Sequence, residues 1–140
     1  MTEVSAKDFA SLHAACFTLP RPWSEAEFTA LLAQPGVFAI GTAKGALLGR
    51  VVADEAELLT LAVDPAERRK GLGQSLVLAF HKKAIDHSAL TAFLEVAARN
   101  RAARALYEQS GWQEAGLRRA YYRGAAGEVD DAVIMTRRLR

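Results

Sequence analysis

Residues 61–77 read LAVDPAERRKGLGQSLV, and this stretch joins an apolar strand pattern to an amphipathic helix through a basic turn with two glycines. The pattern R-x-x-G-x-G runs from Arg68 to Gly73. Glycines let backbone N–H groups approach a ligand without a Cβ in the way. The helix that begins there adds unpaired N–H groups and a partial positive charge. The stretch therefore predicts an anion, such as a pyrophosphate, at the mouth of a helix.

Two other phosphate-binding patterns do not fit this turn. A P-loop needs G-x-x-x-x-G-K-[ST], which the chain lacks. A dinucleotide fingerprint needs G-x-G-x-x-G, and here Leu76 stands where the third glycine belongs. The remaining alternative to an anion site is a helix entry with a solvated basic cluster, formed by Arg68, Arg69 and Lys70. Two glycines and three cations within six residues favour the anion site.

The rest of the chain reads as short helices and strands. Apolar spacing predicts helices over 6–16, 24–33, 73–86 and 100–111, and strands over 37–43, 45–54, 56–64, 89–98, 112–123 and 131–139. The expected order is ααβββαβαββ, which is an α/β fold with a mixed central sheet in a single domain over residues 1–140. The segment 56–98 reads as a right-handed parallel crossover, with antiparallel hairpins at either end of the chain.

Composition and charge narrow the class of protein. The chain has 140 residues, 51% hydrophobic and 24% charged, which suits one globular core. It has no apolar run near the roughly 20 residues of a membrane span, no visible signal peptide, and a single cysteine, Cys16. We therefore expect a soluble, cytoplasmic protein without a disulfide.

Charge is unevenly distributed along the sequence. Residues 1–67 contain four Lys or Arg and nine Asp or Glu, whereas residues 68–140 contain fourteen and seven. The basic part begins at the glycine turn, which agrees with an anionic ligand there, although a solvated basic surface is the alternative. A nucleic acid is not expected, because the basic residues are not interleaved with stacking aromatic residues and no DNA-binding motif is present.

Glu95 is the one charged residue in the apolar run LTAFLEVAA over 90–98. A buried carboxylate is costly unless it is paired or used, and loss of water raises a carboxyl pKa toward the range of a general base. The alternatives are a structural pair with an arginine and a strand-end residue that reaches water. The three histidines lack metal-ligand spacing, so we expect them on the surface or on helix faces and predict no metal.

The stretch 61–77 resembles the acyl-CoA-binding motif of the GNAT superfamily of N-acetyltransferases. Residues 92–122 and the segment RPWSEAEF (21–28) are similar to the bacterial ribosomal-protein-alanine N-acetyltransferases of that superfamily. The resemblance implies the GNAT fold, acetyl-CoA as cosubstrate, and a splay between the parallel strands 56–63 and 90–97. It also implies that acetyl-CoA contacts Leu61, Ala62, Val63, Arg68, Arg69, Lys70, Gly71, Leu72, Gly73, Gln74 and Asn100.

The resemblance further implies two catalytic roles. Glu95 matches the catalytic glutamate of the alanine acetyltransferases, with proton removal either directly or through a water. Tyr107 matches the tyrosine that protonates the CoA thiolate, and an ordinary phenol pKa near 10 suits donation to a thiolate of pKa about 8.5. The alternative for Tyr107 is a core aromatic residue whose hydroxyl bonds the backbone.

The motif LRRAYY holds three candidates for the acceptor groove, namely Arg118, Tyr121 and Tyr122. The alternative is an ordinary strand with solvated arginines. The alanine acetyltransferases usually carry Asn where this chain has Ala120 and Pro where it has Arg123, which leaves the acceptor open. The acidic residues at 128, 130 and 131 could attract a basic peptide.

The sequence therefore predicts an acetyl-CoA-dependent N-acetyltransferase that acts on a protein N-terminal amine, such as a ribosomal-protein alanine, by direct transfer in a ternary complex. One alternative is the same chemistry on a small amine or an antibiotic. Another is a non-catalytic acyl-CoA sensor. We expect a monomer or a homodimer whose partner is the acceptor protein or small amine, with no nucleic acid and no membrane.

Overall fold

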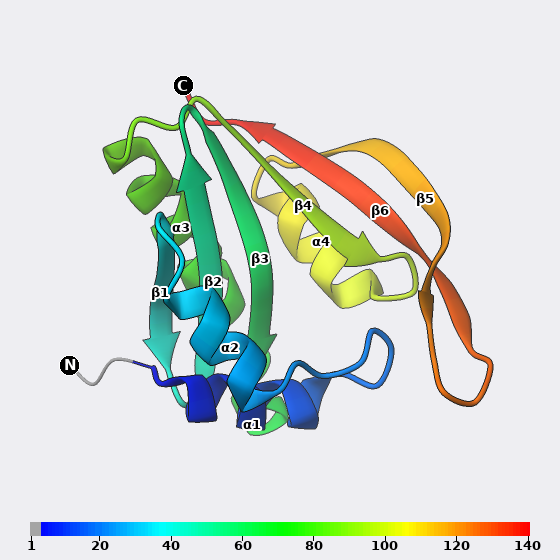
Figure 1. Ribbon diagram of the computed structural model, residues 1–140. Helices are drawn as coiled ribbons and strands as arrows, with labels where there is room; N and C mark the ends of the chain where they lie inside the picture. The colour runs from blue at the N-terminus through cyan, green and yellow to red at the C-terminus, as the bar shows by residue number, and fades with distance from the viewer. Residues whose placement is uncertain (1–3) are drawn as a thin grey trace.

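The computed structural model describes residues 4–140 and has the predicted order of elements (Figure 1). The helices are α1 (Ala6–Cys16), α2 (Glu25–Leu32), α3 (Leu72–Asp86) and α4 (Arg101–Gln109), with a short 3-10 helix at Pro65–Glu67. The strands are β1 (Val37–Thr42), β2 (Gly45–Val52), β3 (Glu55–Val63), β4 (Thr91–Ala97), β5 (Gln113–Arg123) and β6 (Val129–Arg138). No helix in this part of the chain is long and apolar enough to span a membrane.

The first two helices begin at the serines that the sequence indicates. Ser5 and Asp8 form a capping box at the start of α1, and Ser24 and Glu27 form a second one at the start of α2. In each, the serine oxygen accepts a backbone N–H and the carboxylate accepts the backbone N–H of the serine. These bonds satisfy N–H groups that have no partner inside the helix, so both boundaries follow from local chemistry.

The strands form one six-stranded sheet in the order β1-β2-β3-β4-β6-β5. Only β3 and β4 are parallel neighbours, and the other adjacent pairs are antiparallel. The hairpins and the parallel crossover predicted from the sequence are confirmed. The sequence did not predict that β6 lies between β4 and β5, because the pattern of a strand does not say which strands it pairs with.

The parallel strands β3 and β4 are joined over three residue pairs and then separate. Glu55, Ala56 and Glu57 pair with Thr91, Ala92 and Phe93, and no pairing continues toward the carboxyl ends of these strands. The two ribbons form a V in Figure 1, with its mouth toward α1 and α4. The splay expected from the sequence is therefore present, and it leaves one edge of each strand without a ladder partner.

A bulge in β3 lies just inside the mouth of this V. Leu48 pairs with Thr60 and Gly49 pairs with Leu58, so Leu59 is an extra residue in β3. Because side chains alternate along a strand, one extra residue exchanges the two faces beyond it. Leu58 and Leu61, three residues apart, therefore pack in the same cluster, and Thr60 faces α1.

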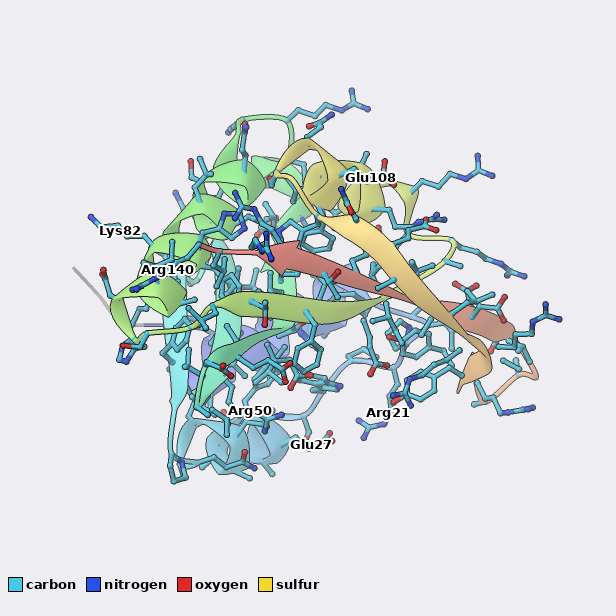
Figure 2. The ribbon with its side chains drawn as sticks, turned by 90° about the horizontal axis from the view of Figure 1, so that it is seen from above. Arg21, Glu27, Arg50, Lys82, Glu108 and Arg140 are labelled. Carbon is cyan, nitrogen blue, oxygen red and sulfur yellow. The ribbon has the colours of Figure 1, made fainter. Side chains whose placement is uncertain are left out.

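Two helical layers cover the sheet, one on each face. Helices α1 and α2 pack on β1 to β3 around Phe9 and Phe28, whose stacked rings lie 4.8 Å apart. Helices α3 and α4 cover the opposite face around Phe80, Tyr107 and Trp112. Seen from above in Figure 2, Glu27 lies on the α2 side and Glu108 on the α4 side.

Strand β4 is covered on one face only, although an apolar run of this kind is typical of a strand covered on both faces. Ala92, Leu94 and Val96 are buried, whereas Phe93 and Glu95 on the other face are half-buried. Helices α1 and α2 lie over β1 to β3 and leave this face of β4 open (Figure 1). Glu95 is thus not enclosed in the core.

Candidate active site

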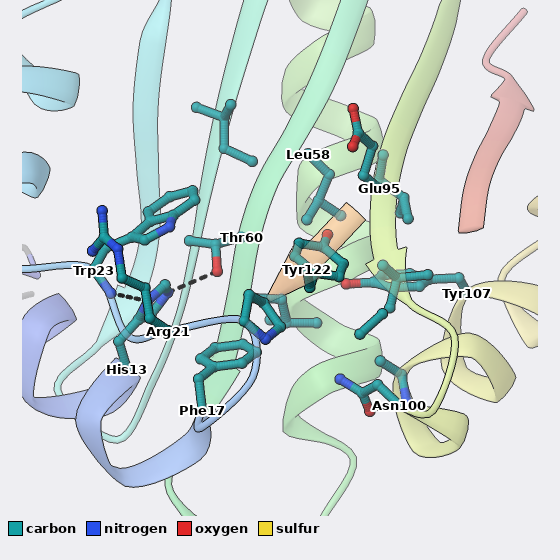
Figure 3. A pocket seen from close by; sticks show the side chains of 17 residues that line it. His13, Phe17, Arg21, Trp23, Leu58, Thr60, Glu95, Asn100, Tyr107 and Tyr122 are labelled. Carbon is teal, nitrogen blue, oxygen red and sulfur yellow. Dashed lines mark hydrogen bonds between the residues drawn. The ribbon is translucent and has the colours of Figure 1, made fainter. Parts of the chain in front are cut away.

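The mouth of the V holds a pocket with a volume of about 130 Å³ (Figure 3). Clefts that enclose whole small ligands typically measure about 300–1,000 Å³, so this pocket suits the reacting ends of larger molecules. Its walls come from α1 and the loop after it, from β3, from β4 with the start of α4, and from β5. Five predicted site residues line it: Leu61, Glu95, Asn100, Tyr107 and Tyr122.

Glu95 lines the pocket from the open face of β4. Its side chain is 24% exposed, and its Oε1 lies 3.8 Å from Nε of Arg118 on β5. The guanidinium of Arg118 also lies over the Tyr121 ring, with Cζ 5.4 Å from the ring centre. Of the alternatives that the sequence left open, an arginine partner is present. Glu95 also lines the pocket, so a molecule that enters the pocket can reach this side chain.

Tyr107 enters the pocket from α4, and Figure 3 shows its hydroxyl directed toward Tyr122. The residue is 5% exposed, and its ring packs 5.9 Å from that of Trp112. Burial raises the pKa of Tyr107 above the ordinary phenol value, so the hydroxyl keeps its proton throughout the neutral range. Tyr107 is therefore a core aromatic residue whose polar end reaches the pocket.

The segment LRRAYY contributes Tyr122 to the pocket, and an irregularity in β5 sets its position. The pairing between β5 and β6 shifts between Arg118 and Tyr122, and Ala120 adopts the left-handed φ of +50°. The Ala120 N–H donates to Oδ1 of Asp131 at 2.7 Å. Burial raises the pKa of Tyr122 to about 12, and the nearby Glu95, Tyr121 and Asp130 add to the shift. Tyr121 is half exposed and lies outside the pocket lining.

One wall of the pocket was not predicted. It consists of the end of α1, the loop to α2 and a threonine of β3, represented by His13, Phe17, Arg21, Trp23 and Thr60. The signal available in the sequence was helical spacing, because His13 follows Phe9 by four residues on the buried face of α1. A polar residue on the apolar face of a helix either has a hydrogen-bond partner in the core or lines a functional site.

His13 connects this wall through two hydrogen bonds. The Trp23 backbone N–H donates to Nδ1 at 3.1 Å, and Nε2 lies 2.8 Å from Oγ1 of Thr60. The residue is 3% exposed, so burial lowers its pKa to about 4, with Glu27 opposing the shift. The ring is neutral at neutral pH, and it attaches both the loop and β3 to α1.

The glycine turn lies at the mouth of the V but outside the pocket lining. Gly71 caps α3 with φ +80° and without a side-chain hydrogen bond, which leaves the first N–H groups of α3 open to a ligand. Arg68 donates from Nε to the Val63 carbonyl at 3.3 Å, and Lys70 lies 3.1 Å from Glu67. Two of the three cations thus bind their own chain and hold the turn against the end of β3.

Asn100 both caps a helix and lines the pocket. Its Oδ1 accepts the backbone N–H of Ala103 at 3.2 Å, as expected for the first residue before α4. An asparagine amide also carries two N–H donors on its nitrogen, which this bond does not use. The cap orients the side chain at the end of β4 beside the pocket.

The acidic residues expected to attract a basic peptide bind their own chain. Asp130 is buried and accepts the backbone N–H of Arg99 and of Asp131. Asp131 accepts from Ala120, and Glu128 accepts from Ala126 at 3.2 Å. These carboxylates shape the β5–β6 hairpin and the end of β4, and their attraction for a basic peptide stays a prediction.

The histidines and Cys16 also occupy structural positions. His81 is buried and accepts from Nε1 of Trp112 at 3.0 Å, and burial lowers its pKa to about 4. His13 and His81 are thus core residues and not surface residues, whereas His87 is exposed. Cys16 is half-buried, and its Sγ lies 3.2 Å from the Val63 carbonyl. Within residues 4–140, no three His, Cys, Asp or Glu are placed to hold a metal ion.

Comparisons with known proteins place this geometry among acetyltransferases. The sequence model of the acetyltransferase (GNAT) family matches residues 3–112. A Salmonella typhimurium protein named ribosomal protein bS18-alanine N-acetyltransferase is 46% identical over 61% of this chain, which spans 57% of that relative. The Mycobacterium tuberculosis protein named N-alpha-acetyltransferase RimI is 35% identical over 92% of this chain and 85% of its own. The crystal structure of the Escherichia coli ribosomal-protein-S18-alanine N-acetyltransferase has a TM-score of 0.85 and 31% identity, covering 99% of this chain and 92% of that one.

Proposed function

Because the chain belongs to the GNAT family of acetyltransferases and is an N-acetyltransferase, we propose that it acetylates the N-terminal amine of a protein with acetyl-CoA, by direct transfer within one ternary complex. The observation that carries this proposal is the pocket in the mouth of the V, which has Glu95 on one wall and Tyr107 on another. The names of the relatives, which are N-terminal and ribosomal-protein-alanine acetyltransferases, support a protein N-terminus as the acceptor.

Acetyl-CoA fits the features at the carboxyl ends of β3 and β4. The edge of β3 that faces β4 has no ladder partner beyond Glu57, so the backbone of 61–63 can pair with the amides of the pantetheine arm. The turn 68–74 and the N-terminus of α3 offer N–H groups and cations to the pyrophosphate. Asn100 lines the pocket, and the N–H groups of its amide are not used by the helix cap.

The reaction requires one bond to form and one to break. The acceptor nitrogen attacks the thioester carbon, the C–N bond forms, and the C–S bond breaks to release the CoA thiolate. Glu95 takes the proton that the nitrogen loses, directly or through a water, and Tyr107 supplies the proton that the thiolate gains. The raised pKa of Tyr107 keeps the phenol protonated until the thiolate forms, and it also makes this phenol a weaker acid than an ordinary tyrosine.

An α-amino group needs less help from the enzyme than a lysine. With a pKa near 7.8, roughly a third of α-amino groups are neutral at pH 7.5, whereas a lysine with a pKa near 10.4 is about 0.1% neutral. Glu95 therefore has less to do for an α-amine than for a lysine.

The test is an acceptor screen with purified protein, acetyl-CoA and detection of the released thiol. We expect turnover with peptides that begin with a free α-amine, including the N-terminal peptide of a ribosomal protein. Peptides with a blocked N-terminus and an internal lysine serve as the control and should be inactive. If every peptide fails and a polyamine or an aminoglycoside is acetylated, the small-amine alternative replaces the proposal. If acetyl-CoA binds by calorimetry and no amine is acetylated, the protein is a sensor.

A further inference from the structure

Thr60 is a pocket residue for which the proposed chemistry has no use. Its side chain is 8% exposed and lines the pocket on the α1 side of β3. The bulge at Leu59 puts it there, because without the extra residue the side chain at 60 would face α3. A hydroxyl at a buried position needs both an acceptor for its proton and a donor for its oxygen, or it lowers stability.

The direction of the hydrogen bonds at His13 follows from one group that can only donate. The Trp23 backbone N–H donates to Nδ1 of His13, so Nδ1 carries no proton. In a neutral imidazole the proton then resides on Nε2, which lies 2.8 Å from Oγ1 of Thr60. The imidazole is neutral because it is buried among the rings of Phe17, Trp23 and Phe28. Nε2–H is therefore the donor and the Thr60 oxygen is the acceptor.

The proton of the Thr60 hydroxyl is then free for a ligand. Within the described chain, residues 4–140, no group accepts it in a hydrogen bond. The remaining direction for this proton is the pocket, since Thr60 forms part of the lining (Figure 3). The chain from Trp23 through His13 to Thr60 thus delivers one oriented hydrogen-bond donor to the pocket.

We propose that Thr60 positions the acceptor by donating its hydroxyl proton to the first peptide carbonyl of the substrate, and that His13 is the positioning residue that orients this hydroxyl. The inference rests on the proposed peptide acceptor and identifies the part of the substrate that is recognised. Thr60 faces the α1 and α2 side, whereas Leu61 and the glycine turn lie toward α3, where acetyl-CoA fits. The first peptide carbonyl belongs to the same residue as the reacting α-amine. A simple alkylamine has no such carbonyl.

The decisive variant is Thr60→Val, which keeps the shape of the side chain and removes the hydroxyl. Loss of one hydrogen bond changes binding by about 0.5–1.5 kcal/mol, which corresponds to a rise of roughly 2–13-fold in KM for the peptide. We expect kcat and the KM for acetyl-CoA to stay within about twofold. Thr60→Ser, which keeps the hydroxyl, is the matched control and should retain the wild-type KM for the peptide.

A second peptide tests the contact itself. In this peptide a trans-alkene replaces the first peptide bond, which removes the carbonyl oxygen without creating a basic amine, and wild-type enzyme should lose about as much affinity for it as Thr60→Val loses for the normal peptide. Thr60→Val should lose nothing more with this peptide, because the two changes remove the same bond. His13→Leu should raise the KM for the normal peptide by a similar factor, and adding Thr60→Val to it should have little further effect.

The outcomes separate this inference from the function on which it rests. If wild-type enzyme acetylates no peptide, the proposed function fails and this inference fails with it. If wild-type enzyme acetylates the peptide and Thr60→Val has the same KM for it, only the assignment of Thr60 is overturned. A rise in the KM for acetyl-CoA in place of the peptide would likewise overturn it, because the hydroxyl would then serve the thioester. Purely additive effects of His13→Leu and Thr60→Val would remove His13 from the proposal.

Discussion

The two sides of the pocket are built in different ways. The donor side, which we define as the end of β3, the turn 68–74 and Asn100, presents mostly backbone N–H groups at strand and helix ends. The amine side, defined as His13, the loop 17–23 and Thr60, presents side chains held by one buried imidazole. Backbone recognition tolerates many side chains, whereas side-chain recognition changes with each substitution. If the two sides hold the donor and the amine as proposed, substitutions on the amine side should change the choice of substrate more than substitutions on the donor side.

The largest effect should come from the two residues that stand between these sides. Glu95→Gln removes the proton acceptor and Tyr107→Phe removes the proton that the thiolate receives. We expect each change to lower kcat by about 10²–10⁴ and to leave acetyl-CoA binding nearly intact. Steady-state kinetics with a verified acceptor, together with calorimetry for acetyl-CoA, measures both quantities. Near-normal turnover in both variants would show that proximity in the pocket is sufficient and that the two roles are wrong.

Acid tests the two buried histidines, His13 beside the pocket and His81 in the core. Burial holds the pKa of His13 and of His81 near 4, below the ordinary value of about 6.5, so the unfolded chain binds protons that the folded chain does not. This stability is complete above about pH 6.5 and is lost as the pH falls toward 4. We expect each histidine to contribute on the order of 2 kcal/mol to the loss between pH 7 and pH 4.

Urea unfolding at several pH values, compared between variants, measures this loss. His81→Gln should show a smaller fall in unfolding free energy with pH than wild-type protein, and His13→Gln likewise. His87→Gln, at an exposed position, is the control and should keep the full fall. Equal pH dependence in all three variants would contradict the assignment.

A smaller effect should come from the glycine turn on the donor side. Gly71 and Gly127 both have left-handed φ, of +80° and +87°, and an added Cβ at either meets no atom within 4 Å. Alanine at either position should therefore cost about 1 kcal/mol of stability from backbone strain alone. Only Gly71→Ala should also raise the KM for acetyl-CoA, by about tenfold, because it alters the turn that faces the pyrophosphate. An equal rise in Gly127→Ala would mean that global strain is the cause.

The smallest effect concerns the irregularity in β5. Ala120 and Ala53 adopt left-handed φ of +50° and +55°, which strains any residue with a Cβ. Glycine should relieve this strain, and after its larger entropy loss on folding a net gain of about 0.5 kcal/mol remains at each site. Thermal unfolding measures the gain. Ala120→Gly should also alter the peptide KM through Tyr122, whereas Ala53→Gly should not.

Local chemistry explains which parts of the fold were predictable. The capping boxes at Ser5 and Ser24, the glycine at 71 and the spacing of apolar residues each act within a few residues, so they can be read from the sequence. The prediction of the donor side rests on the same kind of local pattern, because most of its residues form one contiguous stretch from 61 to 74. Asn100 and Tyr107 lie on one helix that follows directly after β4.

The amine side could not be predicted because its contacts join distant residues. His13 and Thr60 are 47 positions apart, and their hydrogen bond depends on a one-residue bulge that no local sequence pattern predicts. The pairing of Arg118 with Glu95 similarly depends on β6 lying between β4 and β5. Burial of Glu95 was overestimated, because the sequence does not tell which strands α1 and α2 cover.

The place of β6 in the sheet also bears on how the chain folds. Strands β1, β2 and β3 pair as successive hairpins, so this half of the sheet needs only local contacts and can assemble early. The other half waits for residues 129–138, because β4 and β5 are both bonded to β6 and not to each other. Until then β4 presents a long unpaired apolar edge, which is the kind of edge that recruits other chains. A ribosome that stalls before residues 129–138 emerge would expose a nascent chain in which one half of the sheet is complete. The other half would still present the unpaired edge of β4 to other chains.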